Sequence, residues 1–198
     1  MNKIMNFIKS KKIILLTIIS LSAAIFIIIN INKNKDTTNS VTPTPISNKQ
    51  TASYKNITAG EQFNENKINE LIGYPVNSTI SGEIKTNNYR SSNEYRNNEL
   101  KIKKGKVNFI REVVNPDDNK KADDIRNIYG IADYVLYEKE SNSFFNLYVY
   151  LKNGIAYLGH EDGTILEIWY FEPTTLENFI ENYASNYQET LFEGQSTY

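Results

Sequence analysis

The sequence predicts an α+β fold: an N-terminal transmembrane helix, then two tandem helix-plus-antiparallel-meander repeats with a C-terminal helix. Three observations support it: residues 13–31 form an almost unbroken apolar run, Gly and Pro landmarks recur at one offset, and turn signals separate alternating apolar and polar segments. The predicted parts are a cytoplasmic basic tail (1–12), an anchor (13–31), a disordered linker (32–56), a first repeat (57–116) and a second repeat with the C-terminal helix (117–198).

The apolar run is uncharged, and as a helix it would span about 28 Å, roughly one hydrocarbon core. Four lysines and no acid precede it, which predicts a cytoplasmic N-terminus, a single pass through the cell membrane and an extracytoplasmic remainder. Membrane lipid is then the partner of residues 13–31. The small residues Ser22, Ala23 and Ala24 leave an alternative open, in which a signal peptide is cleaved and the rest is secreted.

Charge is divided unevenly along the chain. Residues 1–56 hold 8 Lys and 1 Asp, whereas residues 57–198 hold 14 Lys and Arg against 22 Asp and Glu. An acidic domain is a poor electrostatic partner for nucleic acid, so we expect no nucleic-acid binding. The sequence contains no cysteine, which excludes disulfides and a lipid-modified Cys.

Two landmarks recur at an offset of 57 residues. Gly73 returns as Gly130, and Pro116 returns as Pro173. Strand-like segments lie between the Gly and the Pro in both copies, and a helix-like segment precedes each Gly. This recurrence is the basis for predicting two tandem repeats.

Start signals place three helices. Two capping boxes mark the first and third helices: Thr58 with Glu61, and Thr174 with Glu177. Asp117 and Asp118 favour the start of the second helix. Gly73 and Gly130 are natural helix stops. The last helix has the clearest apolar stripe, made of Leu176, Phe179, Ile180, Tyr183 and Tyr187.

Turn signals define the hairpins. Asn153-Gly154 predicts a two-residue turn that pairs Tyr150 with Tyr157. A three-residue turn at Glu161–Gly163 is preferred next, because a two-residue turn would bury Glu167 among leucines. This register places Tyr148, Tyr150, Tyr157 and Trp169 on one sheet face, opposite the aliphatic face. In the first repeat, a turn at Lys104-Gly105 sets Leu100 and Ile102 against Phe109 and Val107.

Two segments carry a family resemblance. Ile57-Thr-Ala-Gly60 with Ile68 to Pro75 resembles the helix opening of the small outer-membrane assembly lipoproteins (the SmpA/OmlA family), and Asp124 to Asp133 looks like a second copy. Tandem helix-then-meander units are also similar to the β-lactamase inhibitor protein fold. The resemblance implies a non-enzymatic domain that binds proteins through a sheet face. The chain lacks the lipid-bearing Cys of that family, and its second copy lacks the Pro after Gly130.

Catalytic and metal-binding patterns are weak. His160 is the single histidine, and no Gly-Xaa-Ser-Xaa-Gly element accompanies it. The four acids Asp117, Asp118, Asp123 and Asp124 do not match a calcium loop. We therefore expect no catalytic residues, no metal and no cofactor.

The aromatic face is the candidate site. Tyr148, Tyr150, Tyr157 and Trp169 suit a protein interface, because aromatic side chains with polar tips bury much area at low entropy cost. The same residues could instead pack within the domain. The sequence thus predicts a membrane-anchored extracytoplasmic protein-binding or adaptor domain. The alternatives are an envelope glycan hydrolase using paired carboxylates and a secreted inhibitor released by signal cleavage.

Overall fold

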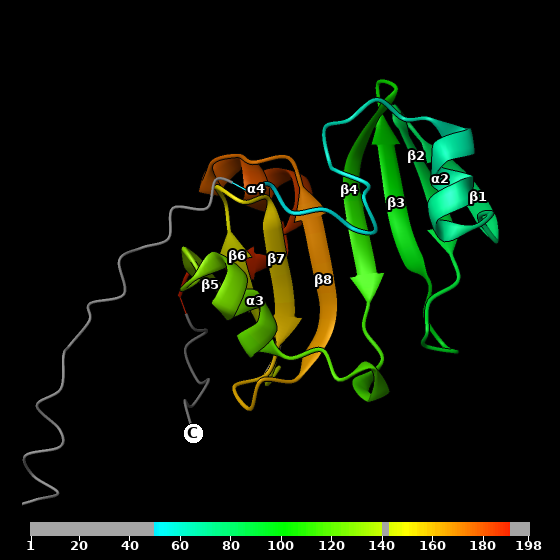
Figure 1. The fold of residues 1–198 in the computed structure, drawn as a ribbon. Coiled ribbons are helices and arrows are strands. Elements are labelled where there is room, and N and C mark those ends of the chain that lie inside the picture. The colour runs from blue at the N-terminus through cyan, green and yellow to red at the C-terminus, as the bar shows by residue number, and fades with distance from the viewer. Residues whose placement is uncertain (1–49, 140–142, 191–198) are drawn as a thin grey trace, which may run out of the picture. The chain divides into compact units, whose positions relative to one another are not determined.

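A computed structural model describes residues 50–139 and 143–190. Every described residue belongs to one compact unit, which lies within Pro45–Tyr198. Its described residues form three eight-residue α-helices and nine strands (Figure 1). In chain order they are α2 (Glu65–Ile72), β1 (Asn77–Ser81), β2 (Ile84–Tyr89), β3 (Asn98–Lys103), β4 (Lys106–Val113), α3 (Ala122–Tyr129), β5 (Tyr134–Glu138), β6 (Asn146–Tyr150), β7 (Ile155–Gly159), β8 (Ile165–Phe171), α4 (Leu176–Tyr183) and β9 (Tyr187–Gln188).

The strands form one antiparallel sheet in the order β1-β2-β3-β4-β8-β7-β6-β5-β9. Its centre is the pairing of β4 with β8, in which Ile110 lies opposite Tyr170 and Arg111 lies opposite Trp169. The predicted fold of two tandem repeats is therefore wrong. That prediction rested on the recurring Gly and Pro residues. These residues do follow helices and strands, but the strands of both proposed repeats join into a single sheet.

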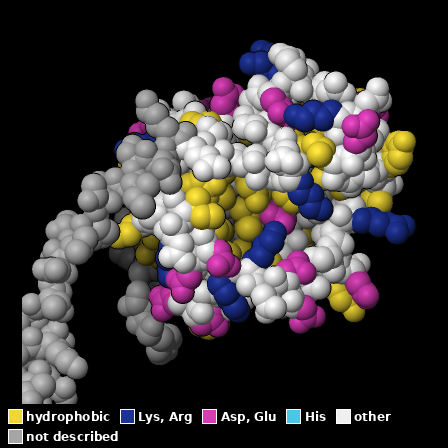
Figure 2. Space-filling view, in the orientation of Figure 1, with side chains coloured by type: hydrophobic (Ala, Val, Ile, Leu, Met, Phe, Trp, Pro, Cys, Tyr) yellow, Lys and Arg dark blue, Asp and Glu magenta, His cyan; other side chains and the backbone are white. Residues whose placement is uncertain are grey.

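The two faces of the sheet are covered differently. α2, α3 and the segment before α2 cover one face, and that core includes Ile57, Ile68, Ile125 and Tyr157. α4 covers the other face through a core that includes Leu136, Val149, Trp169, Phe171 and Phe179. We call the first the α2/α3 face and the second the α4 face. Figure 2 views the α2/α3 side, where hydrophobic side chains remain visible between charged ones.

Helix α4 is the C-terminal helix that the sequence predicts. Thr175 caps it by accepting a hydrogen bond from the amide of Asn178, one residue later than the cap expected at Thr174. Its buried side chains, Leu176 and Phe179, are three positions apart, as on the apolar face of an amphipathic helix. Phe179 is fully buried against the sheet, a burial that contributes about 1.5–3 kcal/mol to folding.

The other helices start later than predicted. α2 begins at Glu65, where the Asn64 side chain accepts from the Lys67 amide at 3.1 Å, and Thr58 only closes a turn with Glu61. α3 begins at Ala122, after a short 3₁₀ helix, Pro116–Asp118. Both end as expected at a glycine with positive φ, +84° at Gly73 and +85° at Gly130.

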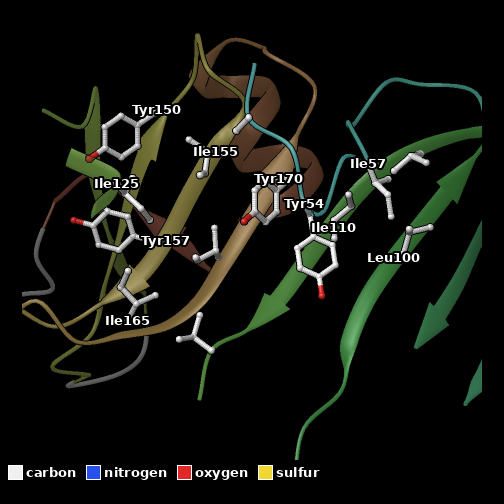
Figure 3. Packing of buried hydrophobic residues seen from close by; sticks show 14 of the residues in the cluster. Tyr54, Ile57, Leu100, Ile110, Ile125, Tyr150, Ile155, Tyr157, Ile165 and Tyr170 are labelled. Atoms are coloured by element: carbon white, nitrogen blue, oxygen red, sulfur yellow. The ribbon is translucent and has the colours of Figure 1, made fainter. Parts of the chain in front are cut away.

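The described part of the predicted linker belongs to the folded unit. The amide of Ala52 donates to the carbonyl of Asn153 at 2.8 Å, and Ala52 and Tyr54 are 2 % and 4 % exposed. Tyr54 lies beside Tyr170 and close to Ile110, over the junction of β8 and β4 (Figure 3). The chain before α2 therefore helps to hold the two halves of the sheet together.

The predicted single-pass membrane placement requires correction. Across residues 50–139 and 143–190, no helix is long and apolar enough to cross a membrane. The transmembrane helix is thus contradicted as an element of the described fold. The segment 13–31, on which the prediction rested, lies outside the described residues.

Candidate functional site: a groove beside helix α4

The four aromatic residues predicted to share a face are divided between the two faces. Tyr148 lies opposite Tyr157 on β6 and β7, and Tyr157 lies opposite Ile168 on β8, which places these residues on the α2/α3 face. Trp169 lies opposite Ala156, on the α4 face. The face predicted for Trp169 is therefore wrong.

The three tyrosines are largely enclosed beneath α3. Tyr150 and Tyr157 are 1 % and 0 % exposed, and Ile125 of α3 packs into the same cluster (Figure 3). Tyr148 is half-buried and stacks on Tyr157, with ring centroids 4.7 Å apart. Burial raises the pKa of Tyr150 and Tyr157, so both stay neutral at physiological pH. Their role as a partner-binding surface stays a prediction, and their burial favours the packing alternative.

Trp169 instead forms part of a groove of about 300 Å³ on the α4 face. We call this the α4 groove. Its sheet side is formed by Glu99 and Lys101 of β3, Phe109 and Arg111 of β4, and Glu167 and Trp169 of β8. Its other side is formed by Tyr183, Asn186 and Tyr187, at and after the end of α4, and Leu158 of β7 also contributes.

The groove exists because α4 covers only part of its face. The buried residues of the α4 core come from β4 to β8, α4 and the segment that follows α4. On the same face of β1 and β2, the register places Thr79 and Thr86 in one row and Asn77 and Asn88 in the next. These polar side chains are half or fully exposed, so this half of the face is open beside the groove.

Aromatic rings form the apolar part of the groove. Phe109 stacks on Tyr183 with centroids 5.3 Å apart and meets Trp169 edge-on at 5.6 Å. Tyr187 meets Trp169 edge-on at 6.0 Å. Burial, followed by the charges of Glu138 and Glu167, raises the pKa of Tyr187 to about 12, so its hydroxyl is neutral at physiological pH.

Two carboxylates lie in the groove, and each is engaged by a cation. Glu99 is 3.3 Å from Lys101 Nζ and 3.4 Å from an Arg111 Nη atom. Glu167 is 3 % exposed, forms an ion pair with Arg96, and accepts a hydrogen bond from Trp169 Nε1 at 2.8 Å. Both carboxylates are thus held in place by neighbouring cations.

Metal chemistry finds no support in the described part of the chain. Within residues 50–139 and 143–190, no group of three or more His, Cys, Asp or Glu side chains could hold a metal ion. His160 lies in the turn after β7, where its Nδ1 accepts from the Asp162 amide at 3.2 Å, and Phe145 packs edge-on against its ring. The acids Asp117, Asp118, Asp123 and Asp124 lie in the first turns of the 3₁₀ helix and α3, where carboxylates favour the helix start.

Sequence reasoning missed the charged members of the groove. Glu99, Arg111 and Glu167 come from three strands that meet through the pairing of β3 with β4 and of β4 with β8, and Arg96, the partner of Glu167, precedes β3. One signal was present: Glu167 is a single acid within an otherwise apolar strand, Ile165–Phe171. A buried acid in such a strand indicates a cation elsewhere in the chain that pairs with it.

Comparisons with known proteins give little guidance. No family model matches the chain, and no curated protein matches it. Among solved structures it is similar to the crystal structure of a cysteine-rich secretory protein from Staphylococcus aureus subsp. aureus Mu50, with 12 % identity and a TM-score of 0.38. The match covers 75 % of this chain and 56 % of that one, so this chain spans little more than half of the other's length. A likeness at this level carries no argument, and nothing in the comparisons or the described residues indicates catalysis.

Proposed function

We propose that this chain is a non-enzymatic protein-binding domain, and that its binding surface is the α4 groove with the adjoining open face of β1 to β3. The observation that carries the proposal is the incomplete cover of the sheet. α4 encloses the face over β5 to β8 and leaves aromatic and charged side chains accessible where its cover ends, at Lys101, Arg111 and Tyr183.

The chemistry of this surface fits a protein interface. Interfaces are enriched in Tyr, Trp, Phe and Arg, and their binding energy concentrates where aromatic rings border a pocket. Tyr183 supplies a half-buried ring, and Arg111 supplies a guanidinium beside it. Phe109, Trp169 and Tyr187, which are 4 %, 7 % and 6 % exposed, form the buried aromatic floor beneath them. The polar residues on the same face of β1 and β2 would form the hydrated rim.

Site-specific photo-cross-linking tests the proposal in the cells that make the protein. A photoreactive amino acid is placed at Thr86, which lies opposite Lys101 on the open face. The control position is Asn127, an exposed residue of α3 beyond the opposite face. We expect a discrete cross-linked protein from Thr86 and none from Asn127.

A further substitution separates specific binding from collision. Lys101→Glu reverses one charge inside the groove without enlarging it, and it should reduce the Thr86 adduct. Equal adducts from both positions, or an adduct that Lys101→Glu leaves unchanged, would refute the proposed surface.

A further inference from the structure

We propose that the α4 groove recognises an acidic side chain of a partner peptide, with Arg111 as the residue that binds the carboxylate. This inference rests on the proposed protein-binding function and specifies the chemistry of the partner. It follows from three properties of the groove: its charge, a buried donor without a partner, and its continuity with the open sheet.

The first property is an excess of positive charge. Lys101 and Arg111 share a single carboxylate, that of Glu99, at 3.3 and 3.4 Å. The other carboxylate, Glu167, already pairs with Arg96. When Arg96 is counted together with the residues that line the groove, three cations face two carboxylates, so one positive charge is unmatched. A carboxylate from a partner would complete the set.

The second property concerns the Arg111 guanidinium. Its Nε atom is buried and has no hydrogen-bond partner among the described residues. Within the described part of the chain, the guanidinium makes one long side-chain hydrogen bond, from Nη2 to Glu99 at 3.4 Å, and 32 % of the Arg111 side chain is exposed. A buried donor without an acceptor is costly, so a small shift of the guanidinium towards an incoming carboxylate would gain a hydrogen bond. The planar fork of Arg can then bind that carboxylate through two parallel N–H groups.

The third property favours a peptide over a free organic acid. A volume of about 300 Å³ is at the small end of ligand sites, enough for one or two side chains. Tyr183, which is half-buried and stacks on the buried ring of Phe109, offers an aromatic surface beside the charges, which suits an apolar residue next to the acid. The open rows at Thr86 and Asn88 continue from the groove and would support the rest of an extended segment.

NMR of the full chain tests the inference through the Arg111 Nε–H signal. The probe is an N-acetylated, C-amidated pentapeptide with a central glutamate between two phenylalanines and a glycine at each end. Its matched control has glutamine at the centre, and glutarate serves as the free organic acid. We expect the glutamate peptide to shift the Arg111 Nε–H signal with a dissociation constant near 1 mM, and the glutamine peptide to bind about tenfold more weakly, a difference of about 1.4 kcal/mol.

Variants assign the effect to the groove. Arg111→Gln should weaken binding of the glutamate peptide about tenfold. The matched control, Lys103→Gln, removes the same charge from the same face of β3 outside the groove, and should change affinity less than about twofold. If Arg111→Gln does not fold, Lys101→Gln and the wild-type Nε–H shift still decide the matter, because Lys101→Gln should weaken binding severalfold.

The outcomes separate the two proposals. Equal binding of the glutamate and glutamine peptides in the groove overturns the carboxylate inference and leaves the protein-binding function standing. Glutarate binding as tightly as the glutamate peptide overturns the choice of a peptide partner. No shift of Arg111 Nε–H with any probe at about 10 mM overturns the inference outright. Failure of cross-linking at Thr86 counts against the protein-binding function alone.

Discussion

Replacing Arg96 with alanine should destabilise the protein far more than an ordinary surface substitution. The Arg96 guanidinium pairs with Glu167, whose side chain is only 5 % exposed. The cross-strand neighbours of Glu167 are the apolar residues Val113 and Leu158. Without Arg96, the carboxylate retains a single described hydrogen-bond donor, Trp169 Nε1.

The destabilisation caused by Arg96→Ala should lie between two limits. Breaking a fully buried ion pair by removing one partner costs about 3–5 kcal/mol, whereas an exposed pair contributes about 0.2–1 kcal/mol. The Arg96 side chain is 47 % exposed and the Glu167 side chain is 5 % exposed, so water reaches the pair from the Arg96 side only. We expect Arg96→Ala to lower the free energy of unfolding by about 2 kcal/mol.

A double-mutant cycle isolates the interaction. Glu167→Gln keeps the size of the side chain and an acceptor for Trp169 while removing the charge, and should cost about 1 kcal/mol. The double variant should be scarcely less stable than Glu167→Gln alone, which gives a coupling energy of nearly the whole cost of Arg96→Ala, about 2 kcal/mol. Arg90→Ala, at an exposed position near the end of β2, is the control and should stay within about 0.5 kcal/mol of wild type.

The assay is equilibrium urea unfolding at neutral pH, followed by Trp169 fluorescence and by circular dichroism. If Arg96→Ala costs no more than Arg90→Ala, and the two substitutions of the cycle are additive, the account of Glu167 as a buried acid held by Arg96 is refuted.

Three further predictions concern stability, each measured by the same unfolding assay. The folded-state pKa of Tyr187 is about 12, so Tyr187 keeps its proton at pH 11, whereas the unfolded chain loses this proton near pH 10. The free energy of unfolding should therefore fall by about 1.4 kcal/mol between pH 8 and 11 because of this residue. Tyr187→Phe should remove that part of the loss. Gly154→Ala should lower the free energy of unfolding by at least about 3 kcal/mol, because φ is +66° and a Cβ would collide with the Phe171 carbonyl. Gly163→Ala should lower it by about 1 kcal/mol, because φ is +89° but a Cβ there would meet no neighbouring atom. Phe179→Ala should cost about 3–5 kcal/mol, because the ring is fully buried against Phe171, 4.6 Å away.

Each of these has a contrary result. An alkaline loss that Tyr187→Phe leaves intact would mean that other groups cause it. Equal costs at Gly154 and Gly163 would show that the close approach to Phe171 is absent in solution. A loss below about 1 kcal/mol for Phe179→Ala would mean that α4 does not depend on that ring.

Local signals predicted several elements because their causes lie within a few residues. The apolar stripe and the cap identify α4, and positive-φ glycines end α2 and α3 at Gly73 and Gly130. The alternation in β6 and β7 correctly separated Val149 and Ala156 from Tyr148 and Tyr157. The register of that hairpin was two residues off, because Tyr150 pairs with Ile155 across a four-residue loop. A shift of two leaves every side chain on its predicted face.

The candidate site was missed because of two shifts of register. An irregularity between Lys101 and Ile102 places Phe109 opposite Lys101 rather than Leu100, on the α4 face. A second, between Leu158 and Gly159, carries Trp169 to the same face. A one-residue shift reverses the face of every following side chain, and no local pattern reveals it. The rule that rejected a buried Glu167 was reasonable, but its partner Arg96 lies 71 residues away in the chain.

The central pairing of β4 with β8 has a consequence for dividing the gene. Each of these strands has a neighbour on both sides only in the intact unit. A fragment ending near residue 116 would leave the eight-residue β4 as an unpaired edge strand, and a fragment starting there would leave the seven-residue β8 unpaired. Unpaired edge strands of that length form hydrogen bonds with strands of other chains, so the separately expressed halves should self-associate or precipitate. The two halves should recombine when they are mixed during refolding.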